Sequence, residues 1–286
     1  MKDFAGRVAV VTGAGSGIGL GLARMFAKEG MDVALCDVRG DALAEAVENV
    51  KGFGKRVIGL EFDVADGAQV EAAATRIEQE LGRLDIVCNN AGIAIYPRPA
   101  AEFTDADWNW IIGVNLHGVI NGVRSFLPRI QKHGQGGHIV NTASIGGFQV
   151  QKGRRTAAYA TTKFGVVALS EGLFNDFEGT NIGISVLAPG AVNTNIYRAS
   201  EYRPDKFGGP VARPNTALPV LNDGLHADAV GRRVLQAIRD DELYIFTHTS
   251  TRDWLARRHA RIIHAFEATE RWEASEAALN NGQERS

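Results

Sequence analysis

The sequence predicts a single α/β domain built on a doubly wound parallel sheet of seven strands, followed by a helical tail. Short β-branched runs alternate with longer amphipathic segments from Arg7 to about Thr247, which is the pattern of consecutive βαβ units. Several runs, such as VAVV and VALC, are apolar at nearly every position, as expected for strands covered by helices on both faces. No proline-rich or low-complexity stretch interrupts the alternation, so residues 1–249 are expected to form one domain.

The predicted strands are, in chain order, Arg7–Thr12, Asp32–Val38, Val57–Val64, Leu84–Asn89, Gly137–Ala143, Asn181–Ala188 and Leu243–Thr247. If they follow the usual order 3-2-1-4-5-6, the second and fourth strands lie on either side of the first. Cys36 and Cys88 would then be at least about 9.6 Å apart, beyond the reach of a disulfide. Neither cysteine has a metal-ligand partner at suitable spacing, so both are interpreted as buried apolar residues and no metal site is predicted.

Charge and composition argue against several classes of protein. The 286 residues contain 31 Lys and Arg against 33 Asp and Glu, so no global charge draws the chain to nucleic acid or to an anionic membrane. The first strand begins near Arg7, which leaves no room for a secretory signal, and no apolar run approaches the roughly 18 residues of a membrane span. A cytoplasmic protein with a small-molecule partner is expected.

Two regions depart from the alternation. Residues 193–223 contain four prolines and the aromatic residues Tyr197, Tyr202 and Phe207 without clear periodicity, and irregular segments of this length are usually lids, here expected to bind substrate. In residues 250–286, apolar side chains recur at helical spacing among arginines and glutamates. This pattern predicts an amphipathic helix whose apolar face packs against the domain or a neighbouring subunit. Its apolar positions are Trp254, Leu255, Ile262, Ile263, Phe266 and Trp272.

The first predicted strand runs directly into a glycine turn and then into a helix. The turn reads Thr12-Gly13-Ala14-Gly15-Ser16-Gly17-Ile18-Gly19, which gives TGxxxGxG rather than GxGxxG. Such a turn lets the backbone approach a pyrophosphate closely, and the positive end of the helix dipole favours the phosphate charge. A tight strand-to-helix turn without any ligand is the structural alternative.

Polar and glycine residues also stand at the carboxyl ends of other predicted strands, where ligands bind in open α/β sheets. Asp37 lies 20 residues beyond Gly17, where a carboxylate can accept hydrogen bonds from ribose hydroxyls and repel a 2′-phosphate. This position favours NAD, although Arg39 could bind such a phosphate. The remaining candidates are Asp63 and Val64 at the third strand, Asn90, Ala91 and Gly92 at the fourth, and Pro189, Gly190, Val192 and Thr194 at the sixth.

Tyr159 and Lys163 lie four residues apart in a strongly helical stretch, so both project from one helix face. A free tyrosine with a pKa near ~10 is a poor base, but an adjacent ammonium and an oxidised nicotinamide would stabilise its phenolate. Ser144, just past the fifth strand, can donate a hydrogen bond to a carbonyl oxygen, and a loop cap is its alternative role. Asn115 interrupts an apolar stripe, where a buried amide is costly unless it is bonded. The stripe, within one predicted helix, is Ile112, Leu116, Val119, Val123 and Leu127.

Taken together, these motifs resemble those of the short-chain dehydrogenase/reductase family, and they occur in the family's order over residues 7–194. The resemblance implies a Rossmann-type fold, a nicotinamide cofactor, and interconversion of a secondary alcohol and a ketone. It implies that Asp63 contacts adenine and that the PGxVxT segment beginning at Pro189 holds the nicotinamide carboxamide. It also implies a catalytic set of Asn115, Ser144, Tyr159 and Lys163.

In the family, the tyrosine exchanges the proton with substrate, the lysine also binds the nicotinamide ribose, and the asparagine kinks its helix and holds a relay water. The gap of 15 residues between Ser144 and Tyr159 is slightly longer than usual, which leaves the shape of that loop open. Members of the family are usually oligomers, so a homodimer or homotetramer is expected.

Three stretches resemble a narrower group, the lignin-related aryl-ether Cα-dehydrogenases, which oxidise benzylic alcohols. They are WIIGVNLHGVING, GHIVNTASIGGF and, in the tail, LYIFTHTSTRDWLARR. An NAD-dependent alcohol dehydrogenase acting on a bulky benzylic alcohol is therefore the leading hypothesis. A 3-oxoacyl or steroid-type ketone reductase is the alternative enzyme, and a non-catalytic nicotinamide-binding regulator is the alternative of another class.

Overall fold

The structure, a computed structural model, describes residues 1–53, 55–212 and 224–283. Seven parallel strands form one sheet in the order β3-β2-β1-β4-β5-β6-β7. The strands are β1 Val8–Thr12, β2 Asp32–Asp37, β3 Val57–Glu61, β4 Ile86–Asn89, β5 Gly137–Thr142, β6 Ile182–Ala188 and β7 Tyr244–Phe246. The predicted doubly wound sheet is confirmed. Cys36 and Cys88 are buried free thiols on β2 and β4, which flank β1.

The strands are shorter than their predicted segments, and β3 differs most because it ends at Glu61 rather than Val64. Its last partner in the sheet is Asp37, whose carbonyl also accepts a hydrogen bond from the N–H of Phe62. The next N–H, that of Asp63, instead donates to the side chain of Gln69 at 3.1 Å. Asp63 therefore lies in the turn after the strand, because the backbone has left the sheet by that residue.

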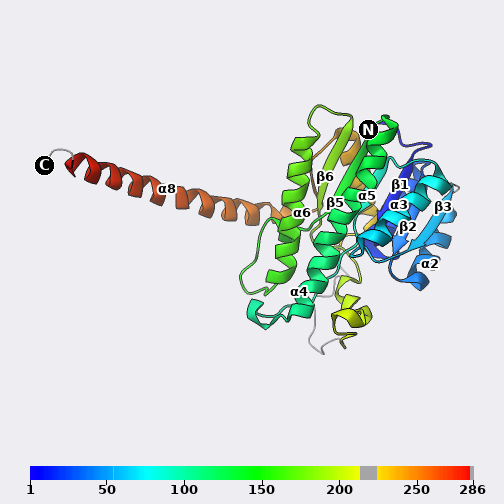
Figure 1. Cartoon of the computed structure of the whole chain (residues 1–286), viewed down its shortest axis with the longest axis horizontal. Helices are drawn as coiled ribbons and strands as arrows, with labels where there is room; N and C mark the ends of the chain where they lie inside the picture. The colour runs from blue at the N-terminus through cyan, green and yellow to red at the C-terminus, as the bar shows by residue number, and fades with distance from the viewer. Residues whose placement is uncertain (54, 213–223, 284–286) are drawn as a thin grey trace. The chain divides into compact units, whose positions relative to one another are not determined.

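Helices cover both faces of the sheet (Figure 1). The cluster on one face includes α1, α2 and α7, and the cluster on the other includes α3, α5 and α6. Phe26 and Phe126 lie fully buried in the two clusters, and each such side chain contributes roughly 1.5–3 kcal/mol. The helices are α1 Gly17–Lys28, α2 Gly40–Lys51, α3 Gly67–Leu81, α5 Gly118–His133, α6 Ala157–Asp176 and α7 Ala227–Asp240.

The helix predicted around Asn115 is not one regular helix. Helix α4 (Asp105–Ile112) leads into a π-helical segment η2 (Gly113–His117) and then into α5. Helix α4 begins at a capping box, in which Thr104 accepts a hydrogen bond from the N–H of Asp107 and the Asp107 carboxylate accepts one from the N–H of Thr104. Such π-helical turns are rare and recur at functional sites.

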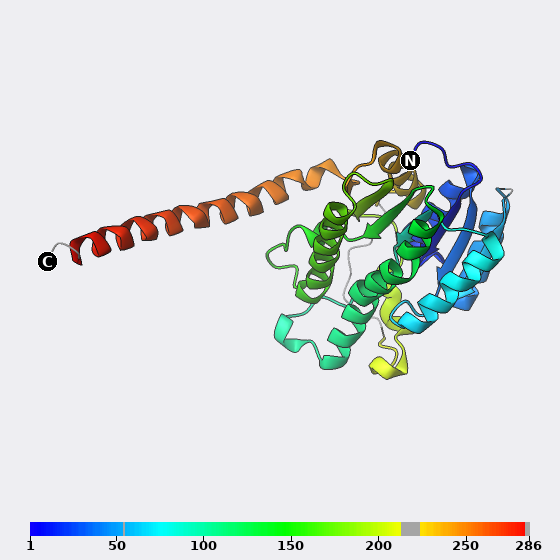
Figure 2. The same ribbon diagram turned by 45° about the horizontal axis from the view of Figure 1, so that its top comes forward.

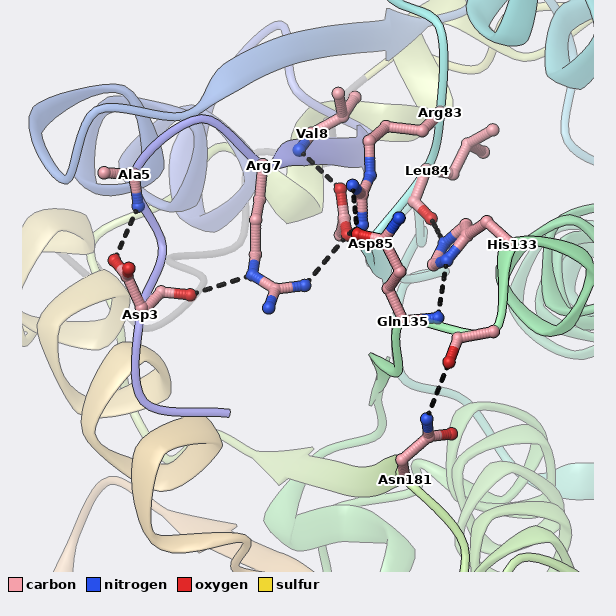
Figure 3. A network of polar contacts seen from close by, with 11 residues as sticks. Asp3, Ala5, Arg7, Val8, Arg83, Leu84, Asp85, His133, Gln135 and Asn181 are labelled. Carbon is pink, nitrogen blue, oxygen red and sulfur yellow. Dashed lines mark hydrogen bonds and ion pairs between the residues drawn. The ribbon is translucent and has the colours of Figure 1, made fainter.

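At the amino ends of the strands, a polar network surrounds Asp85, whose side chain is fully buried (Figure 3). Its carboxylate accepts hydrogen bonds from the N–H of Val8 at 3.0 Å, from Arg7 at 3.0 Å, and from Arg83. Two cations and a backbone donor thus compensate one buried charge. Figures 1 and 2 show the N-terminus at this end of the strands and the yellow-green turns η4 (Ile196–Tyr202) and η5 (Asp205–Phe207) at the other.

The segment predicted as irregular, 193–223, contains the short 3₁₀ turns η4 and η5, and residues 213–223 lie outside the described residues. The chain divides into two compact units, Met1–Thr247 and His248–Ser286. The second unit forms η7 (Thr249–Thr251) and helix α8 (Arg252–Gln283), which confirms a C-terminal helix. Its side chains Ile262, Ile263, Phe266 and Trp272 are exposed, and what covers them stays a prediction. Within the described residues, no helix is both long and apolar enough to span a membrane.

Candidate active site

The glycine turn after β1 is closely packed around its own backbone. A Cβ on Gly13, which has a φ of +66°, would lie 2.7 Å from the Cα of Ala91, and one on Gly19 would lie 2.2 Å from the carbonyl oxygen of Gly13. Ser16 precedes α1, but its hydroxyl makes no capping hydrogen bond to the helix. By contrast, Asp66 caps α3 with two hydrogen bonds. The first turn of α1, with Gly17 and Ile18, therefore keeps N–H groups for another acceptor.

Asp37 reaches this turn from the end of β2. Its Oδ2 accepts a hydrogen bond from the N–H of Gly15 at 2.9 Å, and its Oδ1 accepts one from the N–H of Arg39 at 3.0 Å. The guanidinium of Arg39 lies 3.8 Å from the same Oδ1 and donates to the hydroxyl of Ser16 at 3.3 Å. It also stacks over the ring of Tyr202 at 5.2 Å. Arg39 therefore stands between the glycine turn and η4.

Asp63 stands beside the same end of the sheet, although beyond the strand. One carboxylate oxygen accepts a hydrogen bond from the N–H of Ala65 at 2.9 Å, and the other pairs with Lys206 of η5 at 2.9 Å. Val64 is buried, and its Cγ2 would lie 2.7 Å from a Cβ on Gly118, so it packs tightly against the start of α5. The loop after β3 is thus joined to η5.

Thr12 connects the glycine turn to the loop after β4. Its hydroxyl accepts hydrogen bonds from the N–H groups of Asn90 at 2.9 Å and Ala91 at 3.0 Å, and its carbonyl accepts one from the Asn90 amide at 3.0 Å. The Asn90 amide oxygen also accepts a hydrogen bond from Thr142 of β5 at 3.3 Å. Three adjacent strand ends are therefore fixed together.

The segment after β6 closes the site from the other side. Pro189 accepts a hydrogen bond from the N–H of Ile145 at 3.0 Å, and Gly190 donates to the hydroxyl of Thr247 at 3.1 Å. Val192 is buried and forms an isolated bridge with Leu225. Thr194 follows directly, and its methyl group would lie 3.1 Å from a Cβ on Gly17. This segment therefore faces the glycine turn.

Ser144, Tyr159 and Lys163 converge beyond the end of β5. The Ser144 hydroxyl accepts a hydrogen bond from the N–H of Gly146 at 3.1 Å, and the Tyr159 ring lies beside the same glycine. Helix α6 presents Tyr159 and Lys163 on one face, with the Lys163 ammonium 5.7 Å from the centre of the Tyr159 ring. The ammonium is buried and donates to the carbonyl of Thr142 at 2.9 Å.

Asn115 lies fully buried at the centre of η2, and both ends of its amide are bonded. The oxygen accepts a hydrogen bond from the N–H of Ile93 at 2.8 Å, while the nitrogen donates to the carbonyl of Ile93 at 2.9 Å and to Thr162 at 3.2 Å. A Cβ on Gly92 would lie 3.4 Å from the Asn115 oxygen and 3.4 Å from the Lys163 ammonium. The amide and the ammonium therefore meet at Gly92.

Burial sets the protonation of the two α6 side chains. It raises the pKa of Tyr159 to about 12, although the hydrogen bond with Ser144 acts in the opposite direction, and Tyr197 adds a smaller upward effect. Burial also lowers the pKa of Lys163 to about 8. Both shifts favour the neutral form, but Lys163 with a pKa of about 8 still carries its charge at neutral pH, whereas Tyr159 is protonated there.

The sequence did not reveal several residues that hold this arrangement. Thr142 and Ile93 have no sequence signal, because hydroxyl and backbone partners carry no pattern of their own, and the TGxxxGxG motif includes Thr12 without indicating its hydrogen bonds to Asn90 and Ala91. The spacing of Thr104 and Asp107 matched a capping box, which is a signal that could have been used. Arg203, in the irregular segment after η4, has no sequence signal at all, yet it is buried and pairs with Asp107.

Comparison with known proteins agrees with this geometry. The family model for short chain dehydrogenase matches residues 7–204. A C alpha-dehydrogenase of Sphingobium sp. (strain NBRC 103272 / SYK-6) is 34% identical over 270 residues, covering 92% of this chain and 87% of the relative. A 3beta-hydroxysteroid dehydrogenase 2 of Eggerthella lenta is 35% identical over 193 residues, covering 68% of this chain and 74% of the relative.

A solved structure also resembles the chain throughout its fold. It is a short chain dehydrogenase/reductase from Burkholderia phymatum in complex with NAD, with a TM-score of 0.87 and 35% sequence identity, covering 93% of this chain and 97% of that one. The residues that the family model matches include strands β1 to β6, the glycine turn and the α6 pair, and a nicotinamide cofactor follows from this family. The chain therefore belongs to the short chain dehydrogenase family of oxidoreductases.

Proposed function

We propose that the protein is an NAD-dependent dehydrogenase that interconverts a secondary alcohol and a ketone, with a bulky benzylic alcohol as its substrate. The observation that supports this most directly is the convergence of Ser144, Tyr159 and Lys163 beside the buried amide of Asn115. Acid-base exchange at a carbinol needs a proton acceptor, a cation that stabilises it and a donor to the carbonyl oxygen. The three side chains supply these groups.

The glycine turn fits the pyrophosphate of a dinucleotide. Side chains are excluded at Gly13 and Gly19 by contacts below 3 Å with the protein's own backbone, so only glycine lets the turn close this tightly beside the loop after β4. The uncapped first turn of α1 offers N–H groups to phosphate oxygens. Asp63 and Val64 would contact the adenine. The loop after β4 would contact the nucleotide through Asn90, Ala91 and Gly92. The segment after β6 would contact the nicotinamide carboxamide through Pro189, Gly190, Val192 and Thr194.

A bound nicotinamide would supply the acceptor for the hydride that leaves the carbinol carbon. The residues of the chain would transfer the proton and orient the substrate oxygen. The Tyr159 oxygen takes the hydroxyl proton, Ser144 donates a hydrogen bond to the same substrate oxygen, and Lys163 stabilises the phenolate by its charge. Asn115, which bonds the backbone of Ile93, would hold a water that returns the proton from Lys163 to solvent.

Asp37 supports NAD over NADP. Its side chain is 10% exposed and is fixed by the N–H groups of Gly15 and Arg39, so its carboxylate stays at the turn to accept ribose hydroxyls and to repel a 2′-phosphate. Arg39 reduces that repulsion only in part, because its guanidinium already bonds Ser16 and stacks on Tyr202.

The benzylic substrate is supported by the C alpha-dehydrogenase relative and by the aromatic residues around Tyr159. Tyr159 and Phe207 pack against one cluster that contains Trp110 and Ile95. Apolar surfaces of this kind favour a bulky ring system over a small aliphatic alcohol. A steroid-type alcohol is the second candidate, because the Eggerthella lenta relative covers two thirds of the chain.

The test compares three alcohols under one set of conditions, with NAD and then NADP, by the absorbance of the reduced nicotinamide. They are a guaiacylglycerol aryl ether, a 3-hydroxysteroid and a simple aliphatic secondary alcohol, with a 3-hydroxyacyl thioester as a fourth substrate. We expect the aryl ether to give the highest kcat/KM by at least tenfold, which is about 1.4 kcal/mol of transition-state preference. A tenfold advantage for any other substrate contradicts the benzylic assignment, and no turnover of any contradicts the dehydrogenase assignment.

A further inference from the structure

Arg203 makes a buried ion pair that joins the segment after β6 to helix α4. Its guanidinium donates to Asp107 at 2.6 Å across 96 positions of sequence, and the two side chains are 7% and 4% exposed. The guanidinium also stacks over the ring of Trp110 at 5.1 Å. A charged side chain is buried in this way only when its partners are well placed, so the contact is a specific one.

Two other polar contacts of residues 196–212, here called the lid, lie nearer to solvent. Lys206, which pairs with Asp63, has a side chain that is 56% exposed, and Tyr202, which stacks on Arg39, is 50% exposed. Exposed pairs contribute little to stability, whereas a buried pair is costly to break. Of these three polar contacts, the one made by Arg203 is therefore expected to hold the lid most firmly.

The lid packs against the same apolar cluster as Tyr159. Ala199 and Phe207 pack against the cluster of Ile95, Trp110, Ile111 and Ala158, and Tyr159 packs against the same cluster. Arg203 lies between the two lid residues in sequence and stacks on the Trp110 ring at the heart of this cluster. The position of Ala199 and Phe207 on the cluster shared with Tyr159 thus depends on the contact that Arg203 makes with Trp110.

We propose that Arg203 is a positioning residue that seats the lid on α4, so that Ala199 and Phe207 form an apolar wall of the alcohol site beside Tyr159. This inference rests on the proposed alcohol dehydrogenase function and extends it to substrate size. The wall contacts only the distant part of a large alcohol. A small alcohol reacts at Tyr159 without reaching it.

The chain offers a matched control. Arg98 faces the other carboxylate oxygen of Asp107 at 3.6 Å and stacks on Phe103 at 5.0 Å, but its side chain is 34% exposed and lies outside the lid. Arg98→Met and Arg203→Met therefore remove the same charge beside the same carboxylate. They differ in whether the lid loses its contact.

The experiment measures KM and kcat for the best bulky secondary alcohol and for 2-propanol, the Kd of NADH, and hydrogen exchange of peptides within residues 196–212. In Arg203→Met we expect KM for the bulky alcohol to rise at least tenfold, with KM for 2-propanol and the Kd of NADH within threefold of wild type. Hydrogen exchange of the lid should be faster. Arg98→Met should leave these quantities within twofold of wild type.

In Arg203→Lys we expect a smaller rise in KM for the bulky alcohol than in Arg203→Met. An ammonium can pair with Asp107 but lacks the flat face that stacks on Trp110. If Arg203→Met does not fold, Arg203→Lys carries the same comparison with a smaller expected rise in KM.

Unchanged KM and unchanged lid exchange in the Arg203 variants overturn the inference, as do equal effects of Arg98→Met and Arg203→Met. A joint fall in kcat and NADH affinity without a change in KM assigns Arg203 a purely structural role. If wild type oxidises no secondary alcohol, the proposed function fails, while lid exchange still tests the seating.

Discussion

The two ends of the sheet treat their buried polar groups in opposite ways. At the amino end, the buried carboxylate of Asp85 is matched by Arg7, Arg83 and a backbone N–H (Figure 3). At the carboxyl end, the buried ammonium of Lys163 makes one hydrogen bond to another described residue, with Thr142, and no described carboxylate pairs with it. Ser16 likewise leaves the first turn of α1 uncapped.

This difference in pairing distinguishes buried side chains that stabilise the fold, such as Asp85, from buried side chains with unused donors, such as Lys163, that can bind a ligand. A fully matched charge gains nothing from a further partner, whereas a buried ammonium with spare donors is costly until a substrate or cofactor arrives. Residues at the amino end should therefore affect stability without affecting turnover. Residues at the carboxyl end should affect turnover.

The largest effect is expected for Tyr159→Phe, which removes only the acid-base hydroxyl. We expect kcat to fall about 10³-fold, which corresponds to about 4 kcal/mol, with the Kd of NADH within twofold of wild type. Steady-state kinetics and NADH fluorescence titration measure the two quantities. Tyr244→Phe is the matched control, because Tyr244 lies on the edge strand β7 and its hydroxyl donates a hydrogen bond to Glu171 of α6. Retained activity in Tyr159→Phe would point to another base.

Asp85→Asn tests the other end of the sheet. Removing the carboxylate charge leaves Arg7 and Arg83 without their buried partner, so we expect the free energy of unfolding to fall by about 3 kcal/mol. The kcat/KM and the Kd of NADH of the folded protein should stay within twofold of wild type. Urea unfolding measures the loss, with Asp3→Asn as an exposed control expected to change stability by less than about 0.5 kcal/mol. A large loss of turnover in folded Asp85→Asn contradicts the comparison.

The lowered pKa of Lys163 predicts a pH dependence of stability in the cofactor-free protein. The folded pKa of about 8 lies below the ordinary lysine pKa of 10.5, so between these values the unfolded chain binds more protons and the contribution of Lys163 to stability rises with pH. The slope from this group is about 1.4 kcal/mol per pH unit. Below pH 8 both states are protonated, and the full cost of burying the charge remains.

Urea unfolding of wild type and Lys163→Met at several pH values between 8 and 10 measures this slope. We expect the difference in unfolding free energy between the two proteins to grow in favour of wild type as pH rises. Lys132→Met, whose side chain is 73% exposed, should give a curve parallel to wild type. The difference between the two proteins is used because the raised pKa values of Cys36, Cys88 and Tyr159 act in the opposite direction and are common to both. A Lys163→Met curve parallel to wild type would show that the ammonium is already compensated.

The smallest expected effect concerns cofactor choice. We expect wild type to prefer NAD over NADP in kcat/KM, and Asp37→Ala to shift that ratio toward NADP by about tenfold, which is about 1.4 kcal/mol. Arg39→Ala should shift the ratio further toward NAD, because it removes the cation nearest to a 2′-phosphate. If wild type uses both cofactors equally, Arg39 rather than Asp37 decides the preference.

The sequence predicted the fold well because buried parallel strands are apolar at nearly every residue. The ends of the strands were predicted less accurately. Strand β3 ends early because the N–H of Asp63 donates to the side chain of Gln69, and no local sequence pattern indicates that hydrogen bond. The grouping of Ser144, Tyr159 and Lys163 could be anticipated from motifs at strand ends. Arg203 could not, because its burial depends on Asp107 and Trp110, which are distant in sequence and meet it only in the folded chain.

The π-helical segment η2 also limits how the chain can be altered by insertion or deletion. A π turn holds one residue more than an α turn, so α4 and α5 are out of α-helical phase with one another by that residue. Deleting a single residue from Gly113–His117 could convert the turn to regular helix without breaking the chain. The flanking helices α4 and α5 would keep their orientation, because the wide turn is what accommodates the extra residue. Phe126 would stay in the core, whereas the turn that holds the Asn115 amide against the backbone of Ile93 would be lost. The length of this segment is therefore as much a requirement of the site as the identity of its asparagine.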